Sequence, residues 1–282
     1  MILAGVLAVG AALCFAVCSV LQHRETGHVD HQGVRLLLRL AQRPWFLFAV
    51  LIEVSGLVLQ SIALGNGALI VVQPLLVTGL LFAVPLSAIT DQRRVAPREL
   101  WGAVATVVGL ALFLTGGSPT KGANTFAVSR ACAVGVPLVA LATVAGLWAQ
   151  VWRSARGILL GLTSGLLYGT SGGLLKVVVH RLSDQGSDGL VHWQTLVLVA
   201  MGGVSVVTTQ SAFQAGGLGA PLAVLTLAEP LSAVLVGAAV LHERLASTPM
   251  DLTLEVLGGL VAAAGVVLLS SSPSARLRVA TP

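Results

Sequence analysis

The segment GLGAPLAVLTLAEPLSAVLVGAAVLHE, residues 217–243, is almost wholly apolar, yet it contains the carboxylate Glu229 beside the helix breaker Pro230. Apolar runs of similar length recur along the whole chain of 282 residues, of which 56% are hydrophobic and 10% charged. A soluble protein carries roughly 25% charged residues, and a membrane-spanning helix needs about 20 mainly apolar ones. The composition therefore predicts an all-α polytopic membrane protein.

Nine segments are long and apolar enough to be predicted as membrane-spanning helices. They are residues 2–22, 44–65, 67–90, 98–117, 126–150, 157–181, 190–214, 218–241 and 254–271. The longest connection contains VRLLLRLAQR, in which Arg35, Arg39 and Arg43 share one helical face. This pattern predicts an amphipathic helix on an anionic membrane surface, with a solvated loop as the alternative.

The distribution of basic residues predicts an orientation. Eleven of the sixteen Lys and Arg residues fall in loops on one side or in the C-terminal tail, and five fall on the other side. The positive-inside rule places the eleven in the cytoplasm, so nine spans put the N-terminus outside and the C-terminus inside a plasma membrane. The net charge of +5 is explained by these loops, so no nucleic-acid partner is expected.

Two parts of the chain resemble each other. Residues 65–91, GNGALIVVQPLLVTGLLFAVPLSAITD, align without a gap to residues 217–243, so that Asp91 meets Glu243. ELWG at Glu99 matches EVLG at Glu255 in the helices that follow. We expect two four-helix repeats, 1–125 and 157–282, joined by a linking helix and loop, 126–156. One linking helix makes the repeats inverted, which places a substrate site near the midplane between them.

The second repeat resembles a known family of membrane proteins. PLSAVLVGAAVLHERL followed by EVLGGLVAAAGVVLL is similar to the second-half signature of the drug/metabolite transporter superfamily, in which a proline, a later acid and a glycine-bearing final helix follow in order. YGTSGGLLK, residues 168–176, resembles the first helix of that repeat, whose pattern ends near a lysine. The matching residues are Pro230, Glu243, Gly258, Gly259, Gly265 and Lys176.

The resemblance implies a secondary transporter or exporter of a metabolite or drug-like solute, working by alternating access with proton or cation coupling. EamA-like members have ten helices rather than nine. The nine-helix arrangement and NGALIVVQPLLVTGLLFAVPL, which starts at Asn66, are similar to the NIPA branch, which is associated with magnesium transport. Passage of a divalent cation is therefore the alternative, and a membrane scaffold or lipid-handling subunit is an alternative of another class.

Glu53 and Glu229 are the leading candidates for binding a proton, a cation or a cationic group. A central charge costs about 2.5–3.5 kcal/mol on insertion scales, so each such group needs a reason. Both predicted helices begin on the cytoplasmic side, and both acids are expected roughly 13–16 Å deep at 1.5 Å per residue. The alternative is a structural pair in which Lys176 neutralises one of the acids.

Other polar groups are weaker candidates for the same site. Pro74 and Pro230 weaken their helices and are predicted hinges, because proline cannot donate to the carbonyl one turn earlier. Helix packing is the alternative for both prolines, and interhelical hydrogen bonding is the alternative for the glutamines. The remaining predicted substrate- or ion-binding residues are Lys176, Tyr168, Gln60, Gln73 and Gln210, with Gln214 beside them.

Several residues are predicted to be structural. The five tryptophans fall near helix ends, as in an aromatic belt, and the three cysteines are expected to pack among apolar side chains. His242 and Glu243 are expected on the outer surface, with Glu243 as a cap. No phosphate-binding loop, His/Cys metal cluster or nucleophile elbow occurs, so neither an enzyme nor a cofactor is predicted. The expected partners are a small-molecule or cation substrate and the bilayer, with a homodimer left open.

Overall fold

The structure, a computed structural model, describes residues 2–26, 34–90, 92, 94–115, 127–216, 219–243 and 249–270. Within these ranges the chain is helical and contains no strand. The α-helices are α1 (Ile2–Thr26), α2 (Val34–Leu40), α3 (Pro44–Asn66), α4 (Leu69–Leu76), α5 (Gly79–Thr90), α6 (Pro97–Thr115), α7 (Val128–Val151), α8 (Arg156–Gln185), α9 (Trp193–Gly216), α10 (Gly219–Ala239) and α11 (Pro249–Ser270), with the short 3₁₀ helices η1 (Arg153–Ala155) and η2 (Gly186–Leu190).

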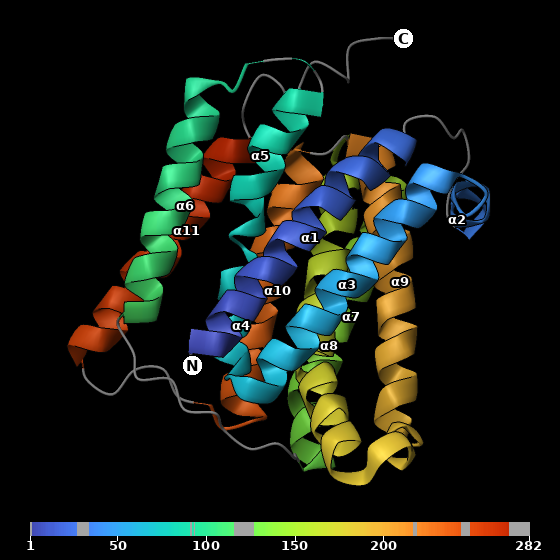
Figure 1. Cartoon of the computed structure of the whole chain (residues 1–282), viewed down its shortest axis with the longest axis vertical. Helices are drawn as coiled ribbons and strands as arrows, with labels where there is room; N and C mark the ends of the chain where they lie inside the picture. The colour runs from blue at the N-terminus through green and yellow to red at the C-terminus, as the bar shows by residue number, and fades with distance from the viewer. Residues whose placement is uncertain are drawn as a thin grey trace.

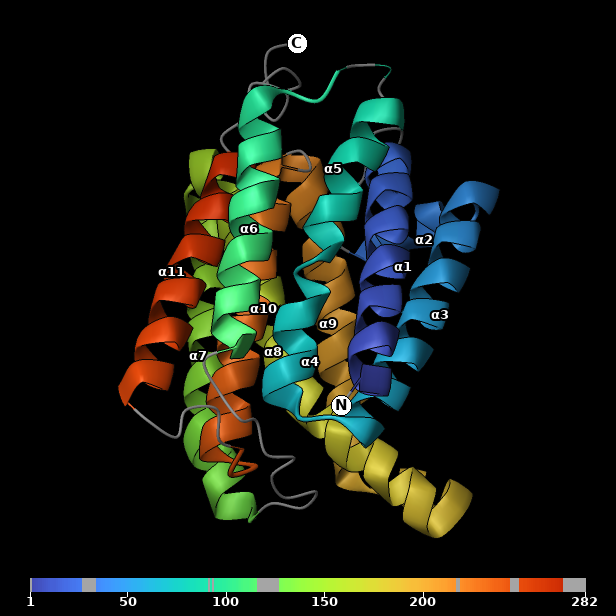
Figure 2. The same cartoon turned by 60° about the vertical axis from the view of Figure 1, so that its left-hand side comes forward.

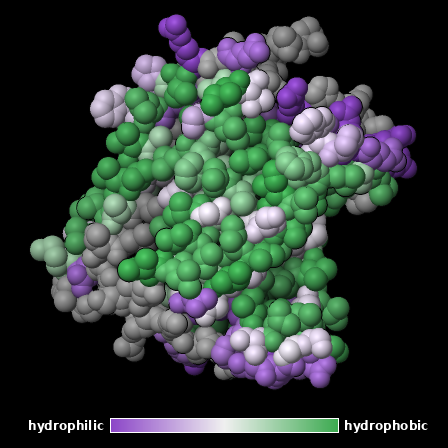
Figure 3. Space-filling view, viewed as in Figure 1, coloured by the Kyte–Doolittle hydropathy of each residue, from purple (hydrophilic) through white to green (hydrophobic). Residues whose placement is uncertain are grey.

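The long helices form one bundle in which successive helices run in alternate directions (Figures 1 and 2). Six helical segments in the described part are long and apolar enough to cross a membrane: 2–26, 44–66, 69–90, 128–151, 153–190 and 193–215. Figure 3 shows apolar side chains covering the middle of one face, with hydrophilic ones gathered at its upper and lower ends. The predicted class, an all-α chain with the features of a membrane protein, is confirmed at this level.

The predicted span 67–90 corresponds to one apolar segment, residues 69–90, whose helix is interrupted close to Pro74, one of the two predicted hinges. α4 ends at Leu76 and α5 begins at Gly79, and the break between them is visible in Figure 2. Pro74 cannot donate to the carbonyl of Ile70, which weakens the helix before the break. The turn is closed by i→i+3 bonds, from Val77 N to Pro74 O at 3.1 Å and from Thr78 N to Leu75 O at 3.1 Å. α10 continues through Pro230.

α8 packs directly on α10 along a row of glycines spaced four residues apart. A Cβ atom on Gly161 would lie 2.6 Å from the carbonyl oxygen of Pro221, and one on Gly165 would lie 2.6 Å from that of Leu225. Gly169 comes still closer to the backbone of α10. Small residues at this spacing let two backbones touch, which is how helices associate tightly where no hydrophobic effect drives them together.

α6 and α11 stand side by side at one edge of the bundle (Figures 1 and 2). Glycines of each helix lie against the backbone of the other. A Cβ atom on Gly109 would lie 2.6 Å from the carbonyl oxygen of Gly258, and one on Gly265 would lie 2.7 Å from that of Gly102. Adding the offset of 156 residues between ELWG and EVLG converts Gly102 to Gly258 and Gly109 to Gly265. The two helices therefore present the same surface to each other.

α2 is amphipathic, as the arginine spacing predicts. Leu36 and Leu40 are fully buried against Phe46 at the start of α3, whereas Arg35 and Arg39 are exposed. Leu38 is also exposed, so the outer face of α2 is not wholly polar. Residues 27–33, the rest of the predicted connection, lie outside the described ranges, as does Asp91, the repeat counterpart of Glu243.

A Gly165→Val substitution tests the contact between α8 and α10. The new side chain would meet the carbonyl oxygen of Leu225 and the Cβ atom of Ala228, so the helices must separate. Overpacking of this kind costs about 1–3 kcal/mol or more, and we expect a lower midpoint of thermal unfolding in detergent. Gly202→Val on α9 is the matched control, because a Cβ atom there meets nothing within 4 Å. Equal midpoints for the two variants would contradict the contact.

Candidate functional site

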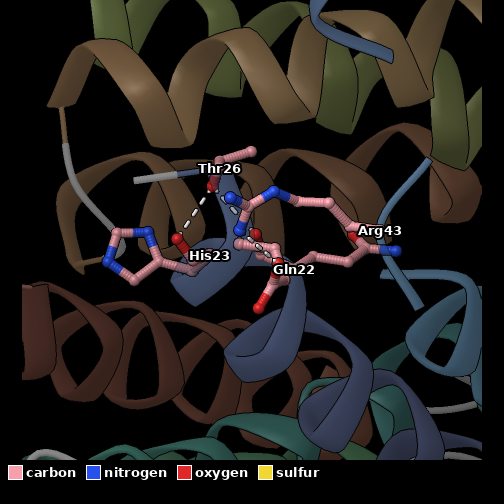
Figure 4. Close-up of polar contacts among 5 residues, drawn as sticks. Gln22, His23, Thr26 and Arg43 are labelled. Carbon is pink, nitrogen blue, oxygen red and sulfur yellow. Dashed lines mark hydrogen bonds and ion pairs between the residues drawn. The ribbon is translucent and has the colours of Figure 1, made fainter. Parts of the chain in front are cut away.

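The last turn of α1 extends beyond residue 22, the predicted end of the first span, and places Gln22 inside a helix. The Thr26 hydroxyl donates to the backbone carbonyls of Gln22 at 2.9 Å and of His23 at 2.8 Å, as Figure 4 shows. Arg43, just before α3, forms a 2.8 Å ion pair with Glu25 across the same end. These contacts hold the ends of α1 and α3 together, and Gln22 is 3% exposed.

Gln22 links three helices through its side-chain amide. Its Nε2 donates to the Glu53 carboxylate on α3 at 2.7 Å, and its Oε1 accepts from Nε2 of Gln210 on α9 at 2.5 Å. Cys18, one turn before Gln22 on α1, also lies beside Glu53. The predicted residues Glu53 and Gln210 are therefore joined through Gln22, which is not among the predicted site residues.

Tyr168 on α8 lies in the neighbourhood of both predicted acids. Its hydroxyl is beside Thr209 of α9, and Glu53 and Glu229 are both in its surroundings. Tyr168, Glu53 and Glu229 are each half-buried and come from three different helices, α8, α3 and α10. The structure thus gathers an aromatic hydroxyl and two carboxyl groups into one polar cluster, which we call the Glu53–Tyr168–Glu229 cluster.

Glu229 is positioned by the contact between α8 and α10. The Ser232 hydroxyl donates to the backbone carbonyls of Ala228 at 2.9 Å and of Glu229 at 3.0 Å. Gly169 lies against this same carbonyl of Glu229, so the backbone at Glu229 is held from two sides. Among the described residues, neither Glu229 nor Glu53 has an ion-pair partner. The carboxyl groups can therefore receive a positively charged or hydrogen-bonding species without first breaking an ion pair within the described chain.

Gln73 is buried without a hydrogen-bond partner for either atom of its amide among the described residues. It lies on α4, close to the break, and faces Gly172 of α8, where a Cβ atom would come within 2.6 Å of Nε2. An unsatisfied buried polar group costs about 1–3 kcal/mol, so this amide calls for an explanation. Gln60 is also buried, on the same face of α3 as Glu53, seven residues away.

Lys176 does not neutralise Glu53 or Glu229. Its ammonium group forms a 2.5 Å ion pair with Glu243, and both side chains are almost completely buried, at 3% and 0% exposure. The Glu243 carboxylate also accepts from the backbone amides of Leu69 and Ile70, at 2.9 and 2.8 Å, in the first turn of α4. Carboxylates stabilise a helix N-terminus because they accept from its unpaired N–H groups.

The expectation that Glu243 lies on the outer surface is therefore wrong, whereas its predicted role as a cap is correct. Glu243 directly follows an apolar run in the sequence, and a charged residue at such a place is usually found on the surface. The packing of α10 against α4 brings the first turn of α4 to the end of α10 instead. His242 is exposed, as predicted.

A Lys176→Met substitution tests this buried ion pair. Removing one partner leaves the Glu243 charge buried, which typically costs about 3–5 kcal/mol, so we expect a large fall in the thermal unfolding midpoint in detergent. Adding Glu243→Gln removes the uncompensated charge while keeping one oxygen that can accept from either Leu69 or Ile70. The double variant should recover much of the loss. If the loss in the double variant equals the sum of the losses caused by Lys176→Met and by Glu243→Gln alone, Lys176 and Glu243 do not depend on each other.

The tryptophans and cysteines divide as follows. All five tryptophans are exposed near helix ends, from Trp193 at 45% to Trp101 at 68%, as the predicted aromatic belt requires. Of the cysteines, Cys18 is buried, Cys14 is half-buried and Cys132 is exposed. Cys18 is more than a packing residue because it lies beside Glu53.

The signal that could have identified Gln22 is its amide, which ends an otherwise apolar predicted span.

The chain is similar to a known protein of about the same length. The chain is 30% identical over 250 residues to an uncharacterized protein of Corynebacterium glutamicum, and the alignment covers 86% of each chain. No protein-family model matches the chain. No solved structure matches it.

Proposed function

For this chain, which belongs to the same family as the uncharacterized Corynebacterium glutamicum protein, we propose the function of a secondary transporter. It moves a small solute, such as a metabolite or a drug-like compound, across the plasma membrane by alternating access. The Glu53–Tyr168–Glu229 cluster is the binding site, and a proton or another cation is coupled to transport through its carboxyl groups. The resemblance of the sequence to the drug/metabolite transporter superfamily supports the same function.

The observation that carries the proposal is that Glu53 and Glu229 have no ion-pair partner among the described residues, whereas the buried Glu243 is paired with Lys176. Glu53 comes from the first predicted repeat and Glu229 from the second, and both lie in the surroundings of Tyr168. Ionisable groups within apolar helices are costly, so acids that are not held in structural ion pairs mark functional sites. Transporters built from inverted repeats bind their substrates where the repeats meet.

The arrangement of the repeats is part of the proposal. We propose nine spans, with repeats 1–125 and 157–282 inverted about the linking helix, an outside N-terminus and a cytoplasmic C-terminus. The reciprocal glycine contact of α6 with α11 supports this arrangement, because a twofold relation between repeats produces such a pair of matched contacts. The alternate directions of successive helices support it as well.

The break between α4 and α5 supplies a means of changing shape. Interrupted helices line substrate sites in transporters, because non-helical backbone at membrane depth is tolerated where it faces protein or a cavity. Pro74 removes one hydrogen bond from this region, and Gln73 beside it holds a buried amide without a partner among the described residues. We propose that α4 moves relative to α5 during transport and that Gln73 gains its partner in another state of the cycle.

Substituting the two acids tests the site. Purified protein is first screened by thermal shift against amino acids, nucleosides, sugars, organic cations and divalent cations, and uptake of the stabilising compound is then measured in proteoliposomes. We expect Glu229→Gln and Glu53→Gln each to lower uptake at least about tenfold, a loss of ~1.4 kcal/mol. In Glu53→Gln the new amide oxygen can still accept from Gln22, so the fold should persist. Tyr168→Phe should cause a smaller loss.

The matched control is Asp188→Asn, which removes one negative charge from an exposed acid of η2, outside the cluster. Full uptake by both Glu→Gln variants would remove the acids from the mechanism. Uptake of Mg²⁺ as the dominant activity would favour the divalent-cation alternative instead. An absence of flux for every compound, together with co-purification of a constant partner, would favour a scaffold or a lipid-handling subunit.

A further inference from the structure

A groove of about 580 Å³ lies between α7, α8, α9 and α10, away from the Glu53–Tyr168–Glu229 cluster. This volume is within the range of roughly 300–1,000 Å³ that is usual for ligand pockets. Its walls include Gly135 and Val139 of α7, Gly173 of α8, Val197 of α9 and Val236 of α10. A Cβ atom on Gly135 would meet nothing within 4 Å, so this glycine opens the groove rather than packing against a neighbouring helix.

The lining suits an aliphatic chain better than a polar solute. Two threonine hydroxyls are part of it, and both are occupied by carbonyls of their own helices: Thr143 donates to Val139 at 2.8 Å and Thr170 to Leu166 at 2.7 Å. The other lining side chains are mostly valine, leucine, alanine and methionine. Three of the four helices around the groove belong to segments long and apolar enough to cross a membrane, so acyl chains are the apolar molecules that surround it.

One end of the groove carries a positive charge. Ala131 and Leu241 line that end, and their chain neighbours Arg130 and His242 are exposed there, with Arg130 Nη1 3.5 Å from His242 Nδ1. Trp193 at the start of α9 lines the same groove and is 45% exposed. Tryptophan is enriched at the level of lipid headgroups, and the planar guanidinium of arginine binds phosphate through paired hydrogen bonds.

We propose that this groove is a binding site for an anionic phospholipid. One acyl chain lies along α7 between Gly135 and Thr143, and the phosphate is bound by Arg130, with His242 beside it. Charge at one end and an apolar wall along the remainder match the two parts of such a lipid. The site is separate from the proposed transport site, since none of the residues of the Glu53–Tyr168–Glu229 cluster lines the groove.

Native mass spectrometry of the full-length protein tests the site. Protein in detergent is incubated with an equimolar mixture of phosphatidylglycerol and phosphatidylcholine, and bound lipid is counted by mass. We expect the wild type to retain phosphatidylglycerol. Arg130→Gln should weaken this retention about tenfold, equivalent to ~1.4 kcal/mol, while leaving phosphatidylcholine unchanged. Gly135→Phe should abolish retention of both lipids, because the ring fills the groove.

Each variant has a matched control outside the groove. Gly203→Phe places the same side chain on α9, where a Cβ atom also meets nothing within 4 Å, but Gly203 does not line the groove. Arg153→Gln removes an exposed arginine from η1, which does not contribute to the groove. Both controls should retain phosphatidylglycerol as the wild type does, and thermal unfolding verifies that all four variants are folded.

Three results would overturn the proposal. The first is wild-type retention of phosphatidylglycerol by folded Gly135→Phe, and the second is equal retention of the two lipids by the wild type. The third is a dimeric wild type that becomes monomeric in Gly135→Phe without loss of lipid, because the groove would then receive a second copy of the chain. Uptake in proteoliposomes is measured separately, so failure of this lipid site is distinguishable from failure of the proposed transport function.

Discussion

The close contact between α8 and α10 is the constraint on which the interior depends. Gly161, Gly165 and Gly169 bring the two backbones together, and no larger side chain fits between them. Tyr168 and Glu229 lie on these two helices, so the spacing of their side chains is set by a contact that is itself made of glycine. In an apolar solvent this close approach replaces the hydrophobic effect as the means of holding helices together.

The polar groups of the interior are satisfied in two different ways. Lys176 and Glu243 neutralise each other, and the Glu243 carboxylate also accepts from two backbone amides, so this pair is a closed structural unit. In the Glu53–Tyr168–Glu229 cluster, Glu53 accepts a hydrogen bond from Gln22, and neither acid has a counter-charge among the described residues. This difference separates a buried pair that stabilises α4 from carboxyl groups that remain available to a ligand.

Part of the candidate site could be predicted from the sequence. Acids in the middle of apolar helices attract attention because insertion is costly, so Glu53 and Glu229 were selected, as were Tyr168 and Gln210. The alternative in which Lys176 neutralises Glu53 or Glu229 is wrong for a physical reason. Its distance from Glu53, Glu229 or Glu243 depends on how α4, α8 and α10 pack, and these helices are far apart along the chain. Gln22 was missed because a polar residue at the end of an apolar run resembles a helix boundary.

Composition and periodicity by themselves determined the class of this protein, because apolar runs of about 20 residues have the length of membrane-spanning helices, which pair their backbone N–H and C=O groups internally. They also located nearly all helix positions and the resemblance between the two parts of the chain. The tertiary structure alone decided which groups meet: the first turn of α4 with Glu243, and Glu53 with Gln210 through Gln22. It also decided that a groove forms with Arg130 close to one end. Such contacts depend on how helices cross and rotate against one another, and a pattern along a single helix does not contain that information.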